Sequence, residues 1–183
     1  MRRVMFALFV QASVLVPFSE VLAHPVPDVP VRGHFMEGGA MRIDVEIDTR
    51  CLEDDPENTP YLTKAIFESM DERAKTGLIK QAGAFLKATT AFHFEPSGQV
   101  EPSFSFRFTT HGAKPLEKPD DPVMITGSWE TKLPEGTDGY RIEALPAGKL
   151  SVVFLNYVRG KQVPRLHVLF PGEASYTLDV SEI

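Results

Sequence analysis

The sequence predicts a mostly β protein, an antiparallel β-sandwich of about nine strands with two helices inserted after the second strand. Three observations predict this fold class. Residues 40–48 alternate between apolar and polar side chains, as a strand with one buried and one wet face does. Only residues 59–89 carry apolar residues at helical spacing. After them, short aromatic and β-branched runs follow one another, separated by Gly and Pro.

The first 23 residues have the three parts of a secretory signal peptide. Arg2 and Arg3 form a basic start, residues 4–18 are mostly apolar, and residues 21–23 suit a signal peptidase site. The apolar run is interrupted and is shorter than the roughly 20 residues that span a bilayer. We therefore expect residues 1–23 to be cleaved and residues 24–183 to form one exported domain, periplasmic or extracellular, that does not itself span a membrane.

The composition disfavours two classes of protein. The chain carries a formal net charge of −6 and no basic patch with interleaved aromatic residues, so we expect no nucleic-acid partner. Cys51 is the single cysteine, which excludes a disulfide within the chain. Its thiol is either buried and inert or available for an intermolecular bond.

The exported part begins with an extended arm and a hairpin. Three prolines in residues 24–30 disfavour both helix and central strand. Strands are expected over residues 31–35 and 40–48, with Glu37-Gly38-Gly39 as the turn between them. On the second strand the residues predicted to face the core are Met41, Ile43, Val45 and Ile47, and those predicted to face water are Arg42, Asp44, Glu46 and Asp48.

The helical block is placed by capping signals. Thr59 followed by Pro60 predicts a helix start, with a capping hydroxyl and then proline at the first helical position. Asp71 is expected to cap a second helix, which Gly77 and Gly83 weaken somewhat. We therefore place a two-helix insertion at about residues 59–89.

The remainder of the chain predicts strands alone. Phe104, Phe106 and Phe108 form one apolar stripe that we expect in the core. Residues 96–99 read as a turn between two aromatic strands. The expected strands lie within residues 90–96, 102–110, 122–134, 139–145, 149–158, 165–170 and 175–180.

Common catalytic signatures are missing from the sequence. It contains no nucleophile elbow, zinc-protease helix, phosphate loop, dinucleotide fingerprint or Cys-x-x-Cys pair. This pattern favours a non-catalytic protein, although a site assembled from distant residues keeps an enzyme open as an alternative. The acidic stretches at residues 53–57 and 118–122 lack the spacing of a calcium loop, so we interpret both as solvated loops.

His24 is the candidate metal-binding residue. Cleavage after Ala23 would make it the first residue, and its α-amine and ring nitrogen would form a two-nitrogen chelate suited to copper or nickel. Pro25 has no amide hydrogen and Val26 is not histidine, so the three-residue amino-terminal copper site is excluded. Such a chelate needs a further ligand, and the alternative is that the histidines are simply solvated. The histidines that could approach across the fold are His34, His93, His111 and His167.

The order of segments resembles a known family. The quoted stretches are DVEIDTRCL, YLTKAIFESM, FLKATTAFHFEPSGQVEPSFSFRF and RLHVLFPGEASYTLDV. In this order they resemble the extracytoplasmic amino-terminal region of HupE/UreJ-type hydrogenase and urease accessory membrane proteins, and similar small exported proteins of unassigned role. The resemblance implies an immunoglobulin-like (Ig-like) sandwich outside a bacterial cell membrane and a link to nickel. No multi-helix membrane portion follows here, so we do not expect transport by this chain alone, and no ligand residue is transferred.

Three hypotheses about function follow. The first is an exported, non-catalytic β-sandwich that binds a ligand or an envelope or membrane protein, as an accessory to nickel or copper handling. The second is a copper-dependent enzyme that uses His24 at the mature amino terminus. The third is a purely structural interaction module.

Overall fold

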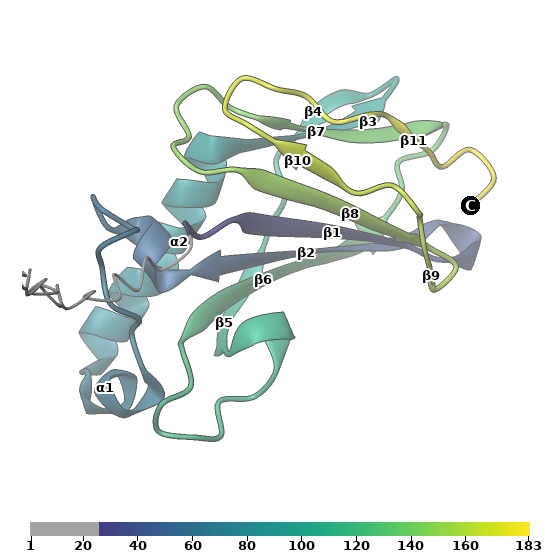
Figure 1. Ribbon diagram of the computed structural model, residues 1–183. Helices are drawn as coiled ribbons and strands as arrows, with labels where there is room; N and C mark the ends of the chain where they lie inside the picture. Colours follow the sequence, from purple (N-terminus) through teal and green to yellow (C-terminus); the bar gives the residue numbers. More distant parts are fainter. Residues whose placement is uncertain (1–25) are drawn as a thin grey trace, which may run out of the picture.

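The computed structural model describes residues 26–183, so the predicted signal peptide and His24 lie outside the described residues. Within residues 26–183 the chain forms eleven strands in two sheets and two α-helices. Figure 1 shows the sheets as two layers, with the helices at one end of the sandwich. The mostly β sandwich with a helical insertion after the second strand is therefore confirmed. None of the described helices is long and apolar enough to cross a bilayer.

The larger layer is a seven-stranded sheet, called the large sheet below. Its strands follow the order β10-β8-β1-β2-β6-β5, and β9 pairs with β8 outside this path. The bounds are β1 Val29–Phe35, β2 Ala40–Asp48, β5 Ser105–Thr109, β6 Met124–Lys132, β8 Val152–Val158, β9 Lys161–Gln162 and β10 His167–Leu169.

The smaller layer is a four-stranded sheet in the order β11-β7-β3-β4, called the small sheet below. Its strands are β3 Thr90–Glu95, β4 Gly98–Val100, β7 Gly139–Ala144 and β11 Leu178–Asp179. Aromatic side chains join the two layers. Tyr140 of the small sheet lies with its ring centroid 5.1 Å from that of Phe35 and 5.5 Å from that of Phe154, both in the large sheet.

One strand pairing differs from the predicted antiparallel arrangement. β1 lies between β2 and β8, antiparallel to β2 but parallel to β8, with Val29 opposite Val152 and Phe35 opposite Val158. The β1–β2 hairpin fixes one neighbour locally, whereas β8 enters from β7 of the other sheet and its direction is set by that crossing. β1 also starts earlier than predicted, because Val29 and Pro30 of the proline arm already pair with β8.

The first helix begins later than its predicted cap. α1 spans Lys64–Ser69 and Thr63, not Thr59, is its N-cap residue. The physical reason is tertiary: Lys64 N donates to the Asp121 carbonyl at 2.9 Å and Ala65 N to the Pro119 carbonyl at 2.9 Å. The loop at residues 118–121 thus satisfies the first amides of the helix, a role that a capping side chain fills elsewhere.

The second helix follows its sequence signals. α2 spans Glu72–Thr89, and the Asp71 carboxylate accepts a hydrogen bond from Ala74 N at 2.7 Å, which confirms the predicted cap. Ala82 and Leu86 are its buried apolar residues. They anchor the helix to the sandwich beside η2, a short 3₁₀ turn at Thr49–Leu52 that contains the buried Cys51.

The core lies between the two sheets and confirms the apolar side of the alternation predicted for residues 40–48. Met41, Ile43, Val45 and Ile47 are each at most 1% exposed. Side chains this thoroughly removed from water each stabilise the fold by about 1.5–3 kcal/mol relative to an exposed position. Burial also raises the pKa of the Cys51 thiol to about 12, so the thiol stays protonated and poorly nucleophilic at neutral pH.

The prediction for the polar side of residues 40–48 is wrong at Glu46 and Asp48, which are 7% and 5% exposed. Asp48 is buried because it pairs with Arg50 of the following turn, whose Nη2 lies 2.7 Å from its Oδ2.

Candidate functional site

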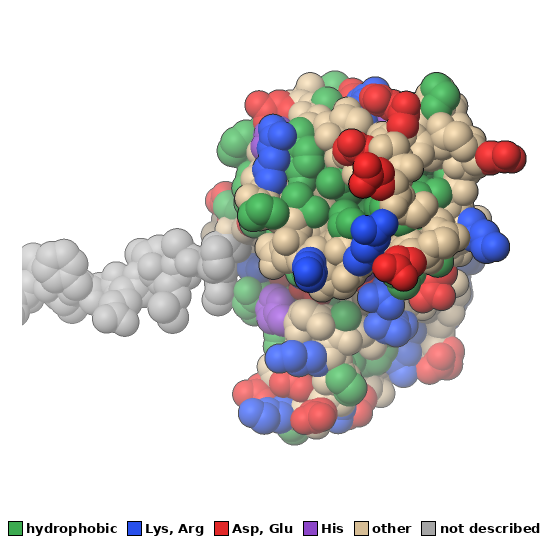
Figure 2. Space-filling model, turned by 90° about the vertical axis from the view of Figure 1, so that its right-hand side faces the viewer, with side chains coloured by type: hydrophobic (Ala, Val, Ile, Leu, Met, Phe, Trp, Pro, Cys, Tyr) green, Lys and Arg blue, Asp and Glu red, His purple; other side chains and the backbone are tan. Residues whose placement is uncertain are grey.

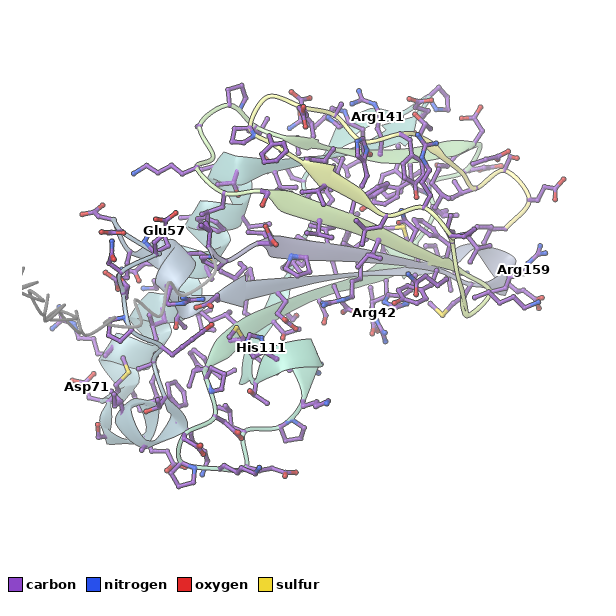
Figure 3. The ribbon with its side chains drawn as sticks, viewed as in Figure 1. Arg42, Glu57, Asp71, His111, Arg141 and Arg159 are labelled. Atoms are coloured by element: carbon purple, nitrogen blue, oxygen red, sulfur yellow. The ribbon has the colours of Figure 1, made fainter. Side chains whose placement is uncertain are left out.

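The outer face of the large sheet carries a dense group of charged side chains. The same alternation that buries one side of β1 and β2 turns Arg32, His34, Arg42, Asp44 and Glu46 to the other side. Figure 3 shows Arg42 and His111 on this side of the molecule, whereas Arg141 lies on the small sheet. Two carboxylates organise the group, each through a different set of partners.

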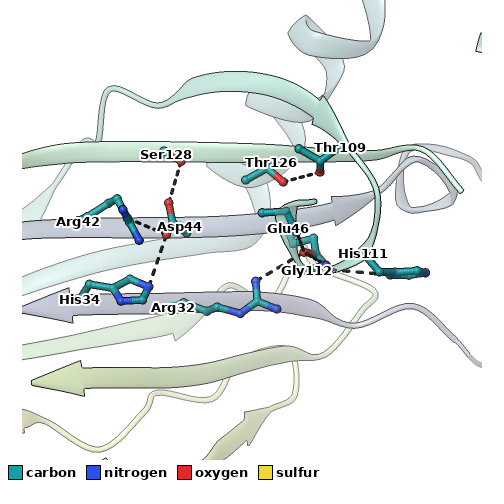
Figure 4. Close-up of polar contacts among 11 residues, drawn as sticks. Arg32, His34, Arg42, Asp44, Glu46, Thr109, His111, Gly112, Thr126 and Ser128 are labelled. Carbon is teal, nitrogen blue, oxygen red and sulfur yellow. Dashed lines mark hydrogen bonds and ion pairs between the residues drawn. The ribbon is translucent and has the colours of Figure 1, made fainter. Parts of the chain in front are cut away.

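Asp44 is the centre of the first set (Figure 4). Its Oδ2 lies 2.9 Å from Arg42 Nε and 3.4 Å from His34 Nε2, and its Oδ1 accepts a hydrogen bond from Ser128 Oγ at 2.7 Å. Asp44 of β2 lies opposite Ser128 of β6 in the strand pairing, which brings the serine hydroxyl to the carboxylate. Asp44 is therefore fully engaged by its neighbours.

His34 is held on two sides. Its ring stacks on Tyr157 of β8, with centroids 4.7 Å apart and planes 7° apart, and it reaches Asp44 with Nε2. Burial, and then the charges of Arg42 and Arg32, lower the pKa of His34, while Asp44 alone opposes them. At neutral pH the ring is therefore uncharged and acts as a hydrogen-bonding group.

The arrangement of Ser128, Asp44 and His34 does not activate a nucleophile. In a catalytic triad the histidine lies between the serine and the acid, because it takes the proton from the hydroxyl. Here the carboxylate lies between the other two, and the serine hydroxyl donates its hydrogen bond to Asp44. The contacts of this cluster fix the positions of the Asp44 carboxylate and the Arg42 guanidinium.

Glu46 is the centre of the second set. Only 7% of this residue is exposed, yet its Oε2 accepts hydrogen bonds from Gly112 N at 2.9 Å and Ala113 N at 3.2 Å. Arg32 Nη1 lies 3.7 Å from the same oxygen, and His111 Nδ1 lies 3.9 Å from Oε1. A buried carboxylate is stable only with such compensation.

The residues held by Glu46 form η3, a turn at His111–Ala113 that folds back over the sheet. Gly112 has φ 71° and Ala113 has φ 60°, and the left-handed conformation is costly for alanine. The two hydrogen bonds to Glu46 offset this cost and fix the turn (Figure 4). The turn becomes one wall of a hollow on the outer face.

This hollow, called the Arg107 cleft below, has a volume of about 340 Å³. Arg32 and Arg42 are paired with Glu46 and Asp44, whereas the guanidinium of Arg107 makes no ion pair or hydrogen bond within residues 26–183. The cleft therefore offers one guanidinium with all its donors available. Its lining residues are Arg32, Arg42, Asp44, Arg107, Gly112, Ala113, Thr126, Ser128 and Glu130.

The histidines considered as metal ligands do not converge in the described part of the chain. His34 and His111 share the outer face but contact different carboxylates. His93 lies on the small sheet, 3.7 Å from Glu143, and His167 lies beside Tyr176. Within residues 26–183 no group of three or more His, Cys, Asp or Glu side chains could hold a metal ion. His24 lies outside those residues.

The sequence predicted that Arg42, Asp44, Glu46 and Asp48 face water, but Glu46 and Asp48 are buried, and no site was predicted on this face. The signal that could have predicted the site is the presence of a basic residue, Arg32, and of acidic residues, Asp44 and Glu46, on the polar sides of two adjacent strands. The contribution of Arg107 and of the 111–113 turn depends on β5 pairing with β6, which is not visible in the sequence.

The chain matches no protein-family model, and a search of curated proteins found no significant match.

Proposed function

We propose that this chain is an exported, non-catalytic binding module that takes a small anionic ligand in the Arg107 cleft. The observation that carries the proposal is the unpaired guanidinium of Arg107 beside two arginines whose positions are fixed by buried or half-buried carboxylates. A guanidinium presents a rigid fork of donors that fits carboxylate and phosphate groups. Export is proposed from the signal-like residues 1–23.

The described chemistry supports binding over catalysis. Ser128 donates its hydrogen bond to the Asp44 carboxylate, which Arg42 and His34 also contact, and not to a histidine that could act as the base of a triad. The Cys51 thiol is buried, and burial raises its pKa to about 12. The polar groups of the cleft are instead pre-organised, which lowers the cost of ordering a site when a ligand binds.

The test is a titration of the protein with inorganic phosphate and with citrate, followed by amide chemical shifts. We expect shifts at Gly112, Ala113 and Ser128, and binding about tenfold weaker in Arg107→Ala, since a charged hydrogen bond contributes about 1.5–3 kcal/mol. Arg73→Ala is the matched control, because Arg73 is an exposed arginine of α2 outside the cleft. Equal binding by the Arg107 and Arg73 variants would overturn the proposal.

A second observation supports an envelope or membrane protein as partner. Leu166, Val168 and Phe170 are 55%, 40% and 61% exposed, at alternate positions along and beside the edge strand β10. An apolar stripe on an unpaired sheet edge is a typical protein-binding surface. Val168→Lys should abolish capture of a membrane protein from envelope extracts. Ile66→Lys, at an apolar position of α1 that is more exposed (55% against 40%), should not. Capture by both variants would contradict this role.

The link to nickel or copper remains a prediction from His24 and from the family resemblance. Titration of Cu(II) and Ni(II) into protein with the native amino terminus at His24 tests it. The comparison is a version with one extra residue before His24, which destroys the two-nitrogen chelate. Equal affinity in both would exclude His24 as a metal site.

A further inference from the structure

We infer that the protein has a second, separate binding site for a small aromatic carboxylate, in a pocket between the free edges of the two sheets. The pocket has a volume of about 390 Å³, near the lower end of the roughly 300–1,000 Å³ typical of ligand sites. Its walls come from α2, β3, β4 and the segment leading into β5. The lining residues are Gly83, Leu86, Lys87, Thr90, Ala91, Phe92, Gln99, Val100, Glu101, Pro102, Phe104 and Phe106.

Strand topology creates the pocket. β4 is the edge of the small sheet and β5 the edge of the large sheet, and the chain crosses from one to the other through residues 101–104. The predicted phenylalanine stripe therefore lies at the open side of the sandwich, so that Phe104 and Phe106 are half-buried. Figure 2 shows the molecule from the right-hand side of Figure 1, where hydrophobic side chains gather in the upper half with charged side chains around them.

The apolar part of the pocket is aromatic. The Phe104 ring centroid lies 5.7 Å from that of Phe92 and 6.0 Å from that of Phe106, and both pairs are tilted. Such spacings and tilts are those of favourable aromatic pairs. A further ring placed among these three would extend the same packing.

Two polar features set the chemistry of the ligand. Thr90 is 5% exposed and its Oγ1 has no hydrogen-bond partner in the described structure, which is uncommon for a buried hydroxyl. On the exposed side, Lys87 Nζ pairs with Glu101 Oε1 at 3.0 Å, with both side chains at least 75% exposed. A ligand carboxylate can replace that of Glu101 at Lys87 while its ring lies among the phenylalanines.

Gly83 makes the proposal testable without disturbing the core. A Cβ at Gly83 would lie 3.6 Å from Phe106 Cε2, an ordinary contact, so a larger side chain there extends into the pocket. Gly77 lies in the same helix, and a Cβ there meets nothing within 4 Å. Gly83→Leu and Gly77→Leu are therefore matched variants. Both place a leucine in α2, but only the leucine at position 83 fills the pocket.

The experiment measures benzoate binding to the full exported chain by calorimetry and by chemical shifts of Phe92, Thr90 and Val100. We expect binding to wild type and Gly77→Leu, and at least about tenfold weaker binding to Gly83→Leu while its circular dichroism spectrum stays folded. Lys87→Gln should weaken benzoate but not the neutral benzyl alcohol, and Lys80→Gln, on the same helix, should weaken neither.

The two sites are distinguished by Arg107→Ala. If benzoate uses the aromatic pocket, this variant binds it as wild type does, whatever the fate of phosphate binding. Loss of benzoate binding in Arg107→Ala, or unchanged binding in folded Gly83→Leu, would overturn the inference. Acetate, which has the carboxylate but no ring, should bind at least about tenfold more weakly than benzoate.

Discussion

Glu46 shows how one carboxylate can define local structure. It is buried, accepts two backbone hydrogen bonds and lies beside Arg32 and His111. These two hydrogen bonds, from the amides of Gly112 and Ala113, hold the turn against the sheet. The shape of the Arg107 cleft therefore depends on this side chain.

Replacing Glu46 by Gln should release the 111–113 turn. Because hydrogen bonds to a charged group contribute about 1.5–3 kcal/mol, we expect the free energy of unfolding to fall by roughly that amount and the Gly112 and Ala113 amides to exchange faster. Urea unfolding and hydrogen exchange measure both. Glu130→Gln, at an exposed position of the same cleft, is the control. Unchanged exchange in the Glu46 variant would show that other contacts hold the turn.

His34 should make stability depend on pH. Burial lowers its pKa in the folded state below the ordinary value of 6.5, so the unfolded chain binds more protons below that value. The free energy of unfolding should therefore decrease as the pH falls from about 7 to about 5. His34→Gln should reduce this slope, and His111→Gln, at an exposed residue, serves as comparison. His93, whose pKa burial also lowers, contributes in the same direction, so some slope should persist in the His34 variant.

α2 is the element in which the helix propensity of the residues conflicts most clearly with the structure. It contains two glycines in its interior, each of which costs a helix about 0.8–1.0 kcal/mol relative to alanine. Neither has a positive φ that would require glycine. Only Gly83 borders a pocket.

Gly77→Ala should therefore stabilise the protein by up to about 1 kcal/mol, because the new methyl group meets open space and the helix gains propensity. Urea denaturation measures the change. Asp71→Ala, which removes the capping hydrogen bond to Ala74, should have the opposite effect of about 0.5–2 kcal/mol. A destabilised Gly77→Ala would mean that a side chain at this position meets an obstacle.

At the scale of the whole molecule, the sandwich encloses its single thiol. Cys51 is 6% exposed and burial raises its pKa to about 12, which favours the inert alternative over an intermolecular bond. A thiol reagent such as 5,5′-dithiobis(2-nitrobenzoate) should react at the rate of unfolding in native buffer and at once in concentrated urea. Rapid reaction of the native protein would place the thiol at the surface.

The sequence was sufficient for features whose cause is local. The alternation of residues 41–47 sets an inner and an outer face because side chains of a strand point to opposite sides. Asp71 caps α2 through a hydrogen bond three residues away. Thr59 and Pro60 carry a similar signal, yet the helix starts at Lys64, because a loop more than 50 residues later supplies its first hydrogen-bond acceptors.

What the sequence by itself determined is the alternating strands, the position of the helical block and the polar side chains of β2. Only the tertiary structure decided that β1 runs parallel to β8, that Thr126 of β6 lies between Glu46 and Arg107, and that Phe104 and Phe106 line a pocket at the edge of the core. The physical reason is the distance along the sequence over which the interactions act. A strand's two faces follow from neighbouring residues, whereas its partners follow from how distant segments bury their apolar sides together.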